Sequence, residues 1–389
     1  MIENVKLSTL CKMQSGGTPS RSNLEYYEGD FPWAKISDLE KSDDGYIYKT
    51  EEHITKEALN SINNRKFKPG TLLLAMYGSV GKTAITKIDL TTNQAILGIN
   101  ILDDKTLDIK YLKYWFFTIK ERLLNRAVGA ALPNISLGIV KDLQIPLPPL
   151  SQQQKIANIL DEADALRQND KALIAKYDEL TQALFLDMFG DPVSNPKGWE
   201  KVKLEEISII SSGSTPSREN ESYYKGEIPW VKTGEVNGKV IYNTSEKISE
   251  DALKNSSCKL YPKGSLIIAM YGQGKTRGQI GMLGIDATTN QACGVLSPSD
   301  KMNFNFLFQL LQLNYEDLRS LGRGGNQPNL NSGLLKNYEV FNPPIELQNQ
   351  FAKRVALIEE QKAIAQKSLE KSEELFNSLL QKAFKGELA

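Results

Sequence analysis

Apolar residues along the chain form two kinds of pattern that alternate. Short apolar runs bounded by Gly, Pro and Ser predict strands near 35–36, 71–76, 95–101, 231–232, 265–270 and 292–296. Longer stretches with helical spacing predict helices at 110–126 and 305–319. This mixture is typical of compact α/β or α+β globules. We expect one over residues 1–146 and another over 191–342.

A long polar stretch follows each globule after a proline-rich stop, and both stretches have heptad spacing. We expect helices over 147–190 and 343–389. The first predicted seam contains Ile159, Leu166, Leu173 and Leu180, together with Ile156, Ala163, Tyr177 and Leu184, and Asp170 interrupts it. The second contains Val355, Lys362, Leu369, Phe376 and Ala383, beside Ile358, Ala365 and Leu379. An antiparallel coiled coil between the globules would bury both seams; two ordinary core helices are the alternative.

The two halves of the chain repeat one another. SGGTPSR at 15–21 returns as SGSTPSR at 212–218, and YYEGDFPW at 26–33 returns as YYKGEIPW at 223–230. AMYG recurs at 75–78 and 269–272, and TTNQA at 91–95 and 288–292. The period is 194 at AMYG (269 − 75) and 197 at TTNQA (288 − 91). A period this long indicates a duplicated domain with its trailing helix rather than a solenoid.

The stretch GTLLLAMYGSVGKTAIT at 70–86 superficially matches a phosphate-binding loop. Such a loop requires four residues between its first glycine and the Gly-Lys pair, so that backbone N–H groups can wrap a phosphate. Here the position five residues before Gly81 is Met76, and the second copy has a still shorter spacing. The stretch therefore predicts a strand ending in a turn, and argues against a nucleotide-binding enzyme.

Composition narrows the function classes further. The chain has 47 basic and 47 acidic residues, which argues against a simple non-specific polyanion binder. One histidine and three scattered cysteines argue against zinc sites and Ser/His/Asp catalysis. The longest apolar run is far shorter than a bilayer span, and no signal peptide is evident. We expect a cytoplasmic, metal-free protein.

Residues shared by both copies carry chemistry that fits double-stranded DNA. Arg21 and Arg218 can bond phosphate or guanine, and the Asn-Gln pairs have amides that can bond adenine in the major groove. Two related globules at a fixed separation suit two DNA half-sites. The candidate DNA contacts are Thr18, Ser20, Arg21, Lys35, Tyr77, Lys82, Asn93, Gln94, Arg126, Asn134, Thr215, Ser217, Arg218, Lys232, Tyr271, Lys275, Arg277, Asn290, Gln291, Arg323, Asn326, Gln327 and Asn329.

Shared residues can also be shared because the fold needs them. Trp33 and Trp230 fit core packing better than base stacking, and Asn93-Gln94 could equally fix a turn. Lys35 and Lys232 follow the tryptophans by two residues, which predicts the same strand face. Residues that read different bases should differ between copies, as the loops at 126–134 and 322–329 do.

The doubled order G-x-T-P-S-R, Y-Y-x-G-x-x-P-W, A-M-Y-G, T-T-N-Q-A and P-P-[LI] resembles the specificity subunit of type I restriction-modification systems over essentially the whole chain. The resemblance implies two target-recognition domains, 1–146 and 191–342, each reading half of a bipartite, asymmetric DNA target. It implies spacer helices at 147–190 and 343–389 that dock two modification (methyltransferase) subunits, which restriction subunits then join. It also implies that this chain is non-catalytic, with S-adenosylmethionine, ATP and Mg on the partner subunits.

Two alternatives of other classes remain. The tetrapeptide Asn342-Pro343-Pro344-Ile345 resembles the N-P-P-[YF] site of adenine-specific methyltransferases, but Ile345 lacks the aromatic ring that stacks on a flipped base. The first copy has Leu147 in place of the asparagine. The other alternative is a coiled-coil adaptor without sequence specificity.

Overall fold

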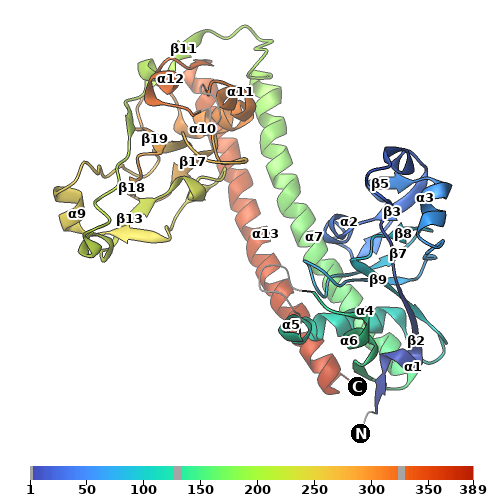
Figure 1. The fold of residues 1–389 in the computed structure, drawn as a ribbon. Helices are drawn as coiled ribbons and strands as arrows, with labels where there is room; N and C mark the ends of the chain where they lie inside the picture. Colours follow the sequence, from blue (N-terminus) through green and yellow to red (C-terminus); the bar gives the residue numbers. More distant parts are fainter. Residues whose placement is uncertain (1–2, 127–133, 323–328, 389) are drawn as a thin grey trace. The chain divides into compact units, whose positions relative to one another are not determined.

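The structure, a computed structural model, describes residues 3–126, 134–322 and 329–388. The chain forms two compact units, and each unit includes parts of both long helices. The first combines Met1–Ile174 with Ile364–Ala389, and the second is Ala175–Ala363. Figure 1 colours the chain from blue to red, and the red C-terminal residues from Ile364 onward belong to the same unit as the blue N-terminal elements.

The first unit contains a five-stranded, a three-stranded and a two-stranded sheet in its described part. The five-stranded sheet has the order β2 (Cys11–Ser15), β9 (Ile96–Ile101), β6 (Leu72–Ala75), β7 (Thr83–Thr86), β4 (Tyr46–Ile47). The three-stranded sheet has the order β5 (Glu52–Ile54), β3 (Phe31–Ala34), β8 (Thr91–Thr92), and β1 (Asn4–Lys6) pairs with β10 (Gln144–Pro146). β4 runs parallel to β7 and β3 parallel to β8, whereas the other pairs are antiparallel.

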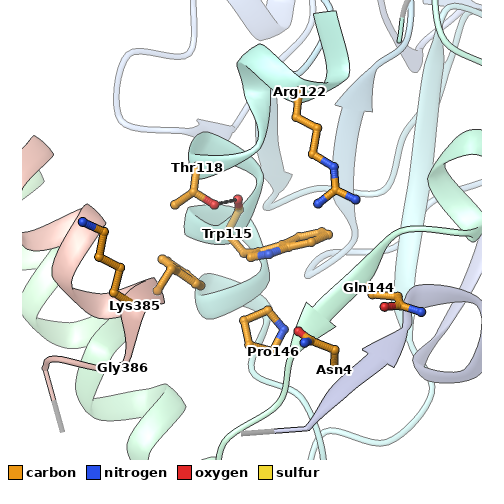
Figure 2. A pocket seen from close by; sticks show the side chains of 9 residues that line it. Asn4, Trp115, Thr118, Arg122, Gln144, Pro146, Lys385 and Gly386 are labelled. Atoms are coloured by element: carbon orange, nitrogen blue, oxygen red, sulfur yellow. Dashed lines mark hydrogen bonds between the residues drawn. The ribbon is translucent and has the colours of Figure 1, made fainter. Parts of the chain in front are cut away.

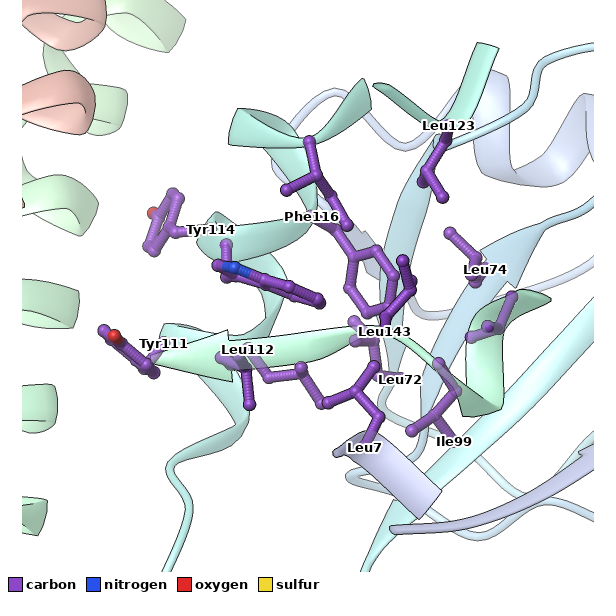
Figure 3. Packing of buried hydrophobic residues seen from close by; sticks show 14 of the residues in the cluster. Leu7, Leu72, Leu74, Ile99, Tyr111, Leu112, Tyr114, Phe116, Leu123 and Leu143 are labelled. Carbon is purple, nitrogen blue, oxygen red and sulfur yellow. The ribbon is translucent and has the colours of Figure 1, made fainter. Parts of the chain in front are cut away.

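Short helices connect and cover these sheets. They are α1 (Leu7–Leu10), the 3-10 helix η1 (Leu24–Tyr27), α2 (Ile36–Glu40), α3 (Lys56–Ser61), α4 (Ile109–Thr118), α5 (Lys120–Arg126) and α6 (Leu137–Lys141). The Asp108 side chain caps α4 by accepting hydrogen bonds from the first backbone N–H groups of the helix. The apolar face of α4, with Leu112 and Phe116, packs near Leu72 and Ile99 of the five-stranded sheet (Figure 3).

The second unit repeats this arrangement. Its sheets are β12 (Ile210–Ser212), β19 (Cys293–Leu296), β16 (Leu266–Ala269), β17 (Ile280–Leu283), β14 (Val240–Ile241); then β15 (Glu246–Ile248), β13 (Ile228–Val231), β18 (Thr288–Thr289); and β11 (Lys201–Lys203) with β20 (Glu339–Phe341). Its short helices are α8 (Leu204–Ile207), η2 (Glu221–Tyr224), η3 (Thr233–Glu235), α9 (Glu250–Lys254), α10 (Phe304–Leu313), α11 (Tyr315–Ser320) and α12 (Ser332–Lys336). The strand orders match those of the first unit position by position, so the sequence repeat is a structural repeat.

Two long helices, α7 (Leu150–Phe189) and α13 (Ile345–Lys385), pair in each unit. In the first unit Ser372 donates a 2.8 Å hydrogen bond to Asp170, and the Arg167 guanidinium lies 4.2 Å from the centre of the Phe376 ring. In the second unit the rings of Phe185 and Phe351 lie 5.4 Å apart, and Lys362 pairs with Asp178. Residue numbers rise along one helix as they fall along the other, so the segments are antiparallel.

The predicted fold class is confirmed, with a duplicated mixed α/β arrangement and two long helices. Strands form at 72–75, 96–101, 266–269 and 293–296 as expected. The strands predicted near 35–36 and 231–232 lie slightly earlier in the chain, at Phe31–Ala34 and Ile228–Val231. β3 ends at Ala34 because the backbone N–H of Lys35 bonds Asp38 at 2.7 Å and starts α2, so Lys35 does not share the strand face of Trp33. Lys232 lies likewise beyond β13, bonding Glu235 at 2.8 Å.

The structure confirms the predicted heptad seam of α13 and corrects that of α7. The predicted seam of α13 is confirmed, since Val355, Leu369, Phe376 and Ala383 are buried. One column of the α7 prediction is wrong: Leu166, Leu173 and Leu180 are 51%, 41% and 49% exposed. The α7 seam instead follows the second predicted column together with Leu160, Arg167, Thr181 and Phe185.

The stretch at 70–86 forms an antiparallel hairpin of β6 and β7. Gly78 and Gly81 in its turn have φ of 65° and 84°, a conformation that favours glycine. A phosphate-binding loop leads from a strand into a helix, whereas this turn leads into the strand β7. The expectation of a strand and turn is confirmed.

Candidate nucleic-acid interface

The structure brings two of the repeated sequence motifs, T-P-S-R and T-T-N-Q-A, together in each copy. The hydroxyl of Thr18 donates a hydrogen bond to Oε1 of Gln94 in the first unit. The Thr215 hydroxyl makes the same bond to Gln291 in the second unit. Loops that are 76 residues apart in sequence therefore form one surface in each copy.

Glycine is required where these loops meet. A Cβ atom on Gly16 would lie 2.1 Å from the carbonyl oxygen of Thr92, and one on Gly213 would lie 2.1 Å from Oγ1 of Thr289. Real Cβ atoms do not approach backbone this closely, so only glycine permits the approach. This close packing explains why S-G recurs before the threonine in both copies.

The same surface continues to the end of β6 in the first unit. The Met76 N–H donates to the Ala95 carbonyl at 2.8 Å, and the Ile135 N–H donates to the Met76 carbonyl at 2.9 Å. Tyr77, which forms a β-bridge with Asn134, is 46% exposed. Backbone bonds therefore connect the TTNQA loop, the AMYG turn and the segment that begins at Asn134.

The second unit builds the same row. The Met270 N–H donates to the Ala292 carbonyl at 2.8 Å, and the Leu330 N–H donates to the Met270 carbonyl at 3.0 Å. Tyr271 is 40% exposed, and Asn329 is exposed beside Leu330. We call each row the recognition strip. The first consists of Thr18, Gln94, Tyr77 and Asn134, and the second of Thr215, Gln291, Tyr271 and Asn329.

An arginine cluster lies beside the strip in the first unit. The Arg21 guanidinium lies 4.2 Å from the ring centre of Tyr27 and 4.9 Å from that of Trp33. Its Nη1 also lies 3.0 Å from one carboxylate oxygen of Glu52, and Lys35 pairs with the other. One carboxylate therefore holds two of the predicted DNA contacts.

The second unit contains the same cluster with nearly the same distances. The Arg218 guanidinium lies 4.1 Å and 5.1 Å from the ring centres of Tyr224 and Trp230. Glu246 accepts from Arg218 at 2.7 Å and from Lys232 at 2.7 Å. Each cluster carries two cations and one carboxylate, a net charge of +1 (2 − 1).

The bridging carboxylates stay ionised at neutral pH. Burial acts to raise the pKa of Glu52, but hydrogen bonds from Lys35 and Arg21 outweigh it and lower the pKa below its usual value of 4.5. Hydrogen bonds, first from Arg218, lower the pKa of Glu246 as well. Both clusters therefore keep their ion pairs at the pH of a cell.

Other predicted contacts lie apart from the strip or have a structural role. Lys82 is half-buried, with its Nζ 3.4 Å from the Ser42 carbonyl, and burial lowers its pKa. The Asn93 side chain accepts from the Ala95 N–H at 3.2 Å, so it fixes the turn. Arg277 is half-buried. Exposed candidates are Ser20, Ser217 and Lys275, and Asn290 is half-buried. The side chain of Arg126, and Arg323, Asn326 and Gln327, lie outside the described residues.

The tryptophans belong to the core, as the packing interpretation predicted. Trp33 and Trp230 are buried, and their indole N–H groups donate to the carbonyls of Gly17 at 3.1 Å and Ser214 at 3.0 Å. Each tryptophan packs against a tyrosine beneath the arginine guanidinium, so its ring is not available for stacking on a base.

Sequence reasoning missed the carboxylates Glu52 and Glu246 and the tyrosines Tyr27 and Tyr224. The tyrosines stood in a repeated motif. The glutamates also repeat, in T-E-E-H-I at 50–54 and T-S-E-K-I at 244–248, a shared pattern T-x-E-x-I. That pattern was the available signal, because its Thr, Glu and Ile recur 194 residues apart (246 − 52).

A cavity of about 560 Å³ in the first unit lies elsewhere (Figure 2). Trp115 forms part of its wall, and the Thr118 hydroxyl donates to the Trp115 carbonyl. Its lining residues are Asn4, Trp115, Thr118, Arg122, Gln144, Pro146, Phe384, Lys385 and Gly386. None of the predicted contacts within the described residues lines this cavity.

Within residues 3–126, 134–322 and 329–388, no cluster of three or more His, Cys, Asp or Glu side chains could hold a metal ion. Over the same residues, the structure has no helix with the length and apolarity that crossing a membrane requires.

Solved structures share this doubled fold. The S subunit of a type I restriction-modification system from M. genitalium aligns with a TM-score of 0.58 at 19% identity, covering 98% of this chain and 96% of that one. A chain from a study of complex assembly in the type I R-M system aligns with a TM-score of 0.56 at 17% identity, covering 99% and 98%. The fold is thus that of type I specificity subunits.

Sequence comparison defines the family. The family described as type I restriction modification DNA specificity domain matches residues 2–176 and 196–374, so the chain belongs to this family and carries the domain twice. The MjaIX specificity subunit of Methanocaldococcus jannaschii is 28% identical over 98% of this chain and 92% of its own. The HindI specificity subunit of Haemophilus influenzae is 25% identical over 82% and 72%.

The predicted class is therefore confirmed: this is a specificity subunit of a type I restriction-modification system. The non-catalytic assignment agrees with it, because the family is one of DNA recognition domains.

Proposed function

We propose that each unit reads one half of a bipartite, asymmetric DNA target through its recognition strip together with the segments that differ between the copies. The repeat of the strip carries this proposal: a Thr–Gln hydrogen bond, an exposed Tyr and an Asn occur in the same order in both units. Their hydroxyl and amide groups are those that bond base edges. We assign the recognition domains to 1–146 and 191–342.

Segments whose sequences differ between the copies supply the difference that an asymmetric target requires. Lys41–Lys49 of the first copy is replaced by the unrelated segment Asn237–Asn243 in the second, and the loops at 126–134 and 322–329 also differ. The identical strips would place both units on DNA in the same way, while the segments that differ between the copies would select different bases.

We further propose that the long helices at 147–190 and 343–389 set the half-site spacing and dock two modification subunits, which restriction subunits then join. Support comes from the exposed leucines of α7, since Leu166 and Leu173 are seven residues apart and 51% and 41% exposed. S-adenosylmethionine, ATP and Mg belong on this proposal to the partner subunits, and the complex acts in the cytoplasm.

Selection from a random duplex library tests the proposal. The chain purified with its modification subunits should enrich two unequal blocks of specified bases separated by unspecified ones. An adaptor without sequence specificity would instead bind all duplexes equally at matched salt. Labelled S-adenosylmethionine bound by this chain alone would favour the methyltransferase alternative.

A further inference from the structure

The two arginine clusters are more alike than a base-reading site should be. Arg21 and Arg218 lie 4.2 Å and 4.1 Å from the tyrosine ring centres, and both side chains are 54% exposed. Each is bonded to a glutamate that also holds a lysine. Side chains that read the different halves of an asymmetric target should differ, whereas the DNA backbone is the same at both half-sites.

The geometry leaves part of each guanidinium available. A guanidinium has five N–H donors in a planar fork, and the carboxylate forms an ion pair with Nη1 of Arg21 and of Arg218. The aromatic rings beneath each guanidinium restrict the plane of the group. A guanidinium held in one plane, within a cluster of net positive charge, can donate two parallel hydrogen bonds to two oxygens of one phosphate group.

Resting on the proposed function, we propose that Arg21 and Arg218 each bind one phosphate of the DNA backbone, with Glu52 and Glu246 as positioning residues. These two contacts hold the units on the duplex and carry no sequence information. Discrimination between the two half-sites then falls to the segments that differ between the copies.

Neutralising the arginine tests the phosphate contact. For the chain purified with its modification subunits, Arg21→Gln should weaken binding to the selected target and to a scrambled duplex equally, by about tenfold. The slope of log affinity against log salt should fall by about 0.9, the value for one phosphate. Lys6→Gln is the control, because Lys6 is an exposed cation of the same unit paired with Asp142. It removes the same charge and should leave the slope unchanged.

The glutamate variant separates positioning from simple charge. Glu52→Gln adds one positive charge to the surface, so general electrostatic attraction predicts tighter DNA binding. Positioning predicts the opposite, because the loosened Arg21 meets phosphate less often, and we expect about threefold weaker binding to both duplexes. Arg21→Lys keeps the charge without the fork and should fall between wild type and Arg21→Gln.

Three results would overturn the inference. Weaker binding to the target alone would make Arg21 a base contact. Unchanged affinity and slope in Arg21→Gln would make the cluster purely structural, and equal or tighter binding by Glu52→Gln would remove the positioning role. Urea unfolding checks that each variant folds, and Arg21→Lys serves if Arg21→Gln does not. A wild-type complex without preference for its target would refute the proposed function instead, while the salt slopes still judge the phosphate contact.

Discussion

Gly213 illustrates how single residues build the candidate interface. A Cβ atom at this position would lie 2.1 Å from Oγ1 of Thr289 and 2.2 Å from its carbonyl oxygen. The contact joins the loop of Thr215 to the loop of Gln291. The interface therefore depends on backbone packing as well as on its polar side chains.

Gly213→Ala should lower the free energy of unfolding by about 2 kcal/mol or more, because the methyl group must push two loops apart. Gly234→Ala is the matched control, since a Cβ there meets nothing within 4 Å. It should change stability by less than about 0.5 kcal/mol. Urea unfolding measures both, and equal stability of the two variants would contradict the packing account.

The bridging glutamates predict a pH dependence. The pKa of Glu52 and of Glu246 is lower in the folded chain than the usual 4.5, so the unfolded chain binds protons first as pH falls. Their stabilising effect is therefore present above pH 4.5 and is lost as pH falls through the lowered folded pKa.

A double variant, Glu52→Gln with Glu246→Gln, should consequently lose less stability than wild type between neutral and acid pH. Urea unfolding at about pH 6 and about pH 4 measures the difference, within the titration range of carboxylates. The same acid sensitivity in both proteins would show that other carboxylates dominate.

At the scale of single residues, the sequence predicts which side chains belong to the candidate interface but not which side chains they contact. Thr18, Gln94 and Arg21 were predictable because they recur in both copies. Their contacts were not, because Glu52 lies 31 residues from Arg21 (52 − 21) and only the fold brings the two together.

Among the elements, α7 shows where periodicity is insufficient. Both of its heptad columns contain apolar residues, and the larger leucines favoured the wrong one. The helix is instead oriented by large contacts near its ends, such as Phe185 with Phe351 and Leu160 in the core of the first unit. Between them the seam accepts polar residues, and Asp170 bonds Ser372 rather than interrupting the packing.

On the proposed function, the exposed leucines of α7 contact the modification subunits. Replacing Leu166 and Leu173 together by Gln should leave the free energy of unfolding within about 1 kcal/mol of wild type, since little buried area is lost. The same double variant should fail to copurify with modification subunits.

The control is Leu102→Gln, which changes a 63% exposed leucine of the same unit outside the helices. Its copurification should match wild type. Undiminished assembly by the double variant would show that the modification subunits dock elsewhere.

For the whole molecule, the repeat was readable from sequence because the same motifs recur in the same order at separations of 194 to 197 residues. The composition of the first compact unit was not, since it combines two segments far apart in the chain, as the contact of Arg167 with Phe376 shows. Contacts of this kind depend on the antiparallel pairing of α7 and α13, which periodicity alone does not determine.

Both long helices contribute residues to both units, so their length is the proposed determinant of half-site spacing. Deleting one heptad from each helix shortens both by about 10 Å. The preferred spacing should change by about 3 base pairs, given roughly 34 Å per ten base pairs. Library selection with the shortened chain measures it, and an unaltered spacing would reject this role of the helices.

Methylome sequencing of a host strain with and without this gene tests the central claim most directly. Two units that read two half-sites predict methylation at a motif of two unequal specified blocks around a gap of fixed length, and its complete loss in the deletion strain. A single uninterrupted motif, or methylation that persists without the gene, would contradict the account.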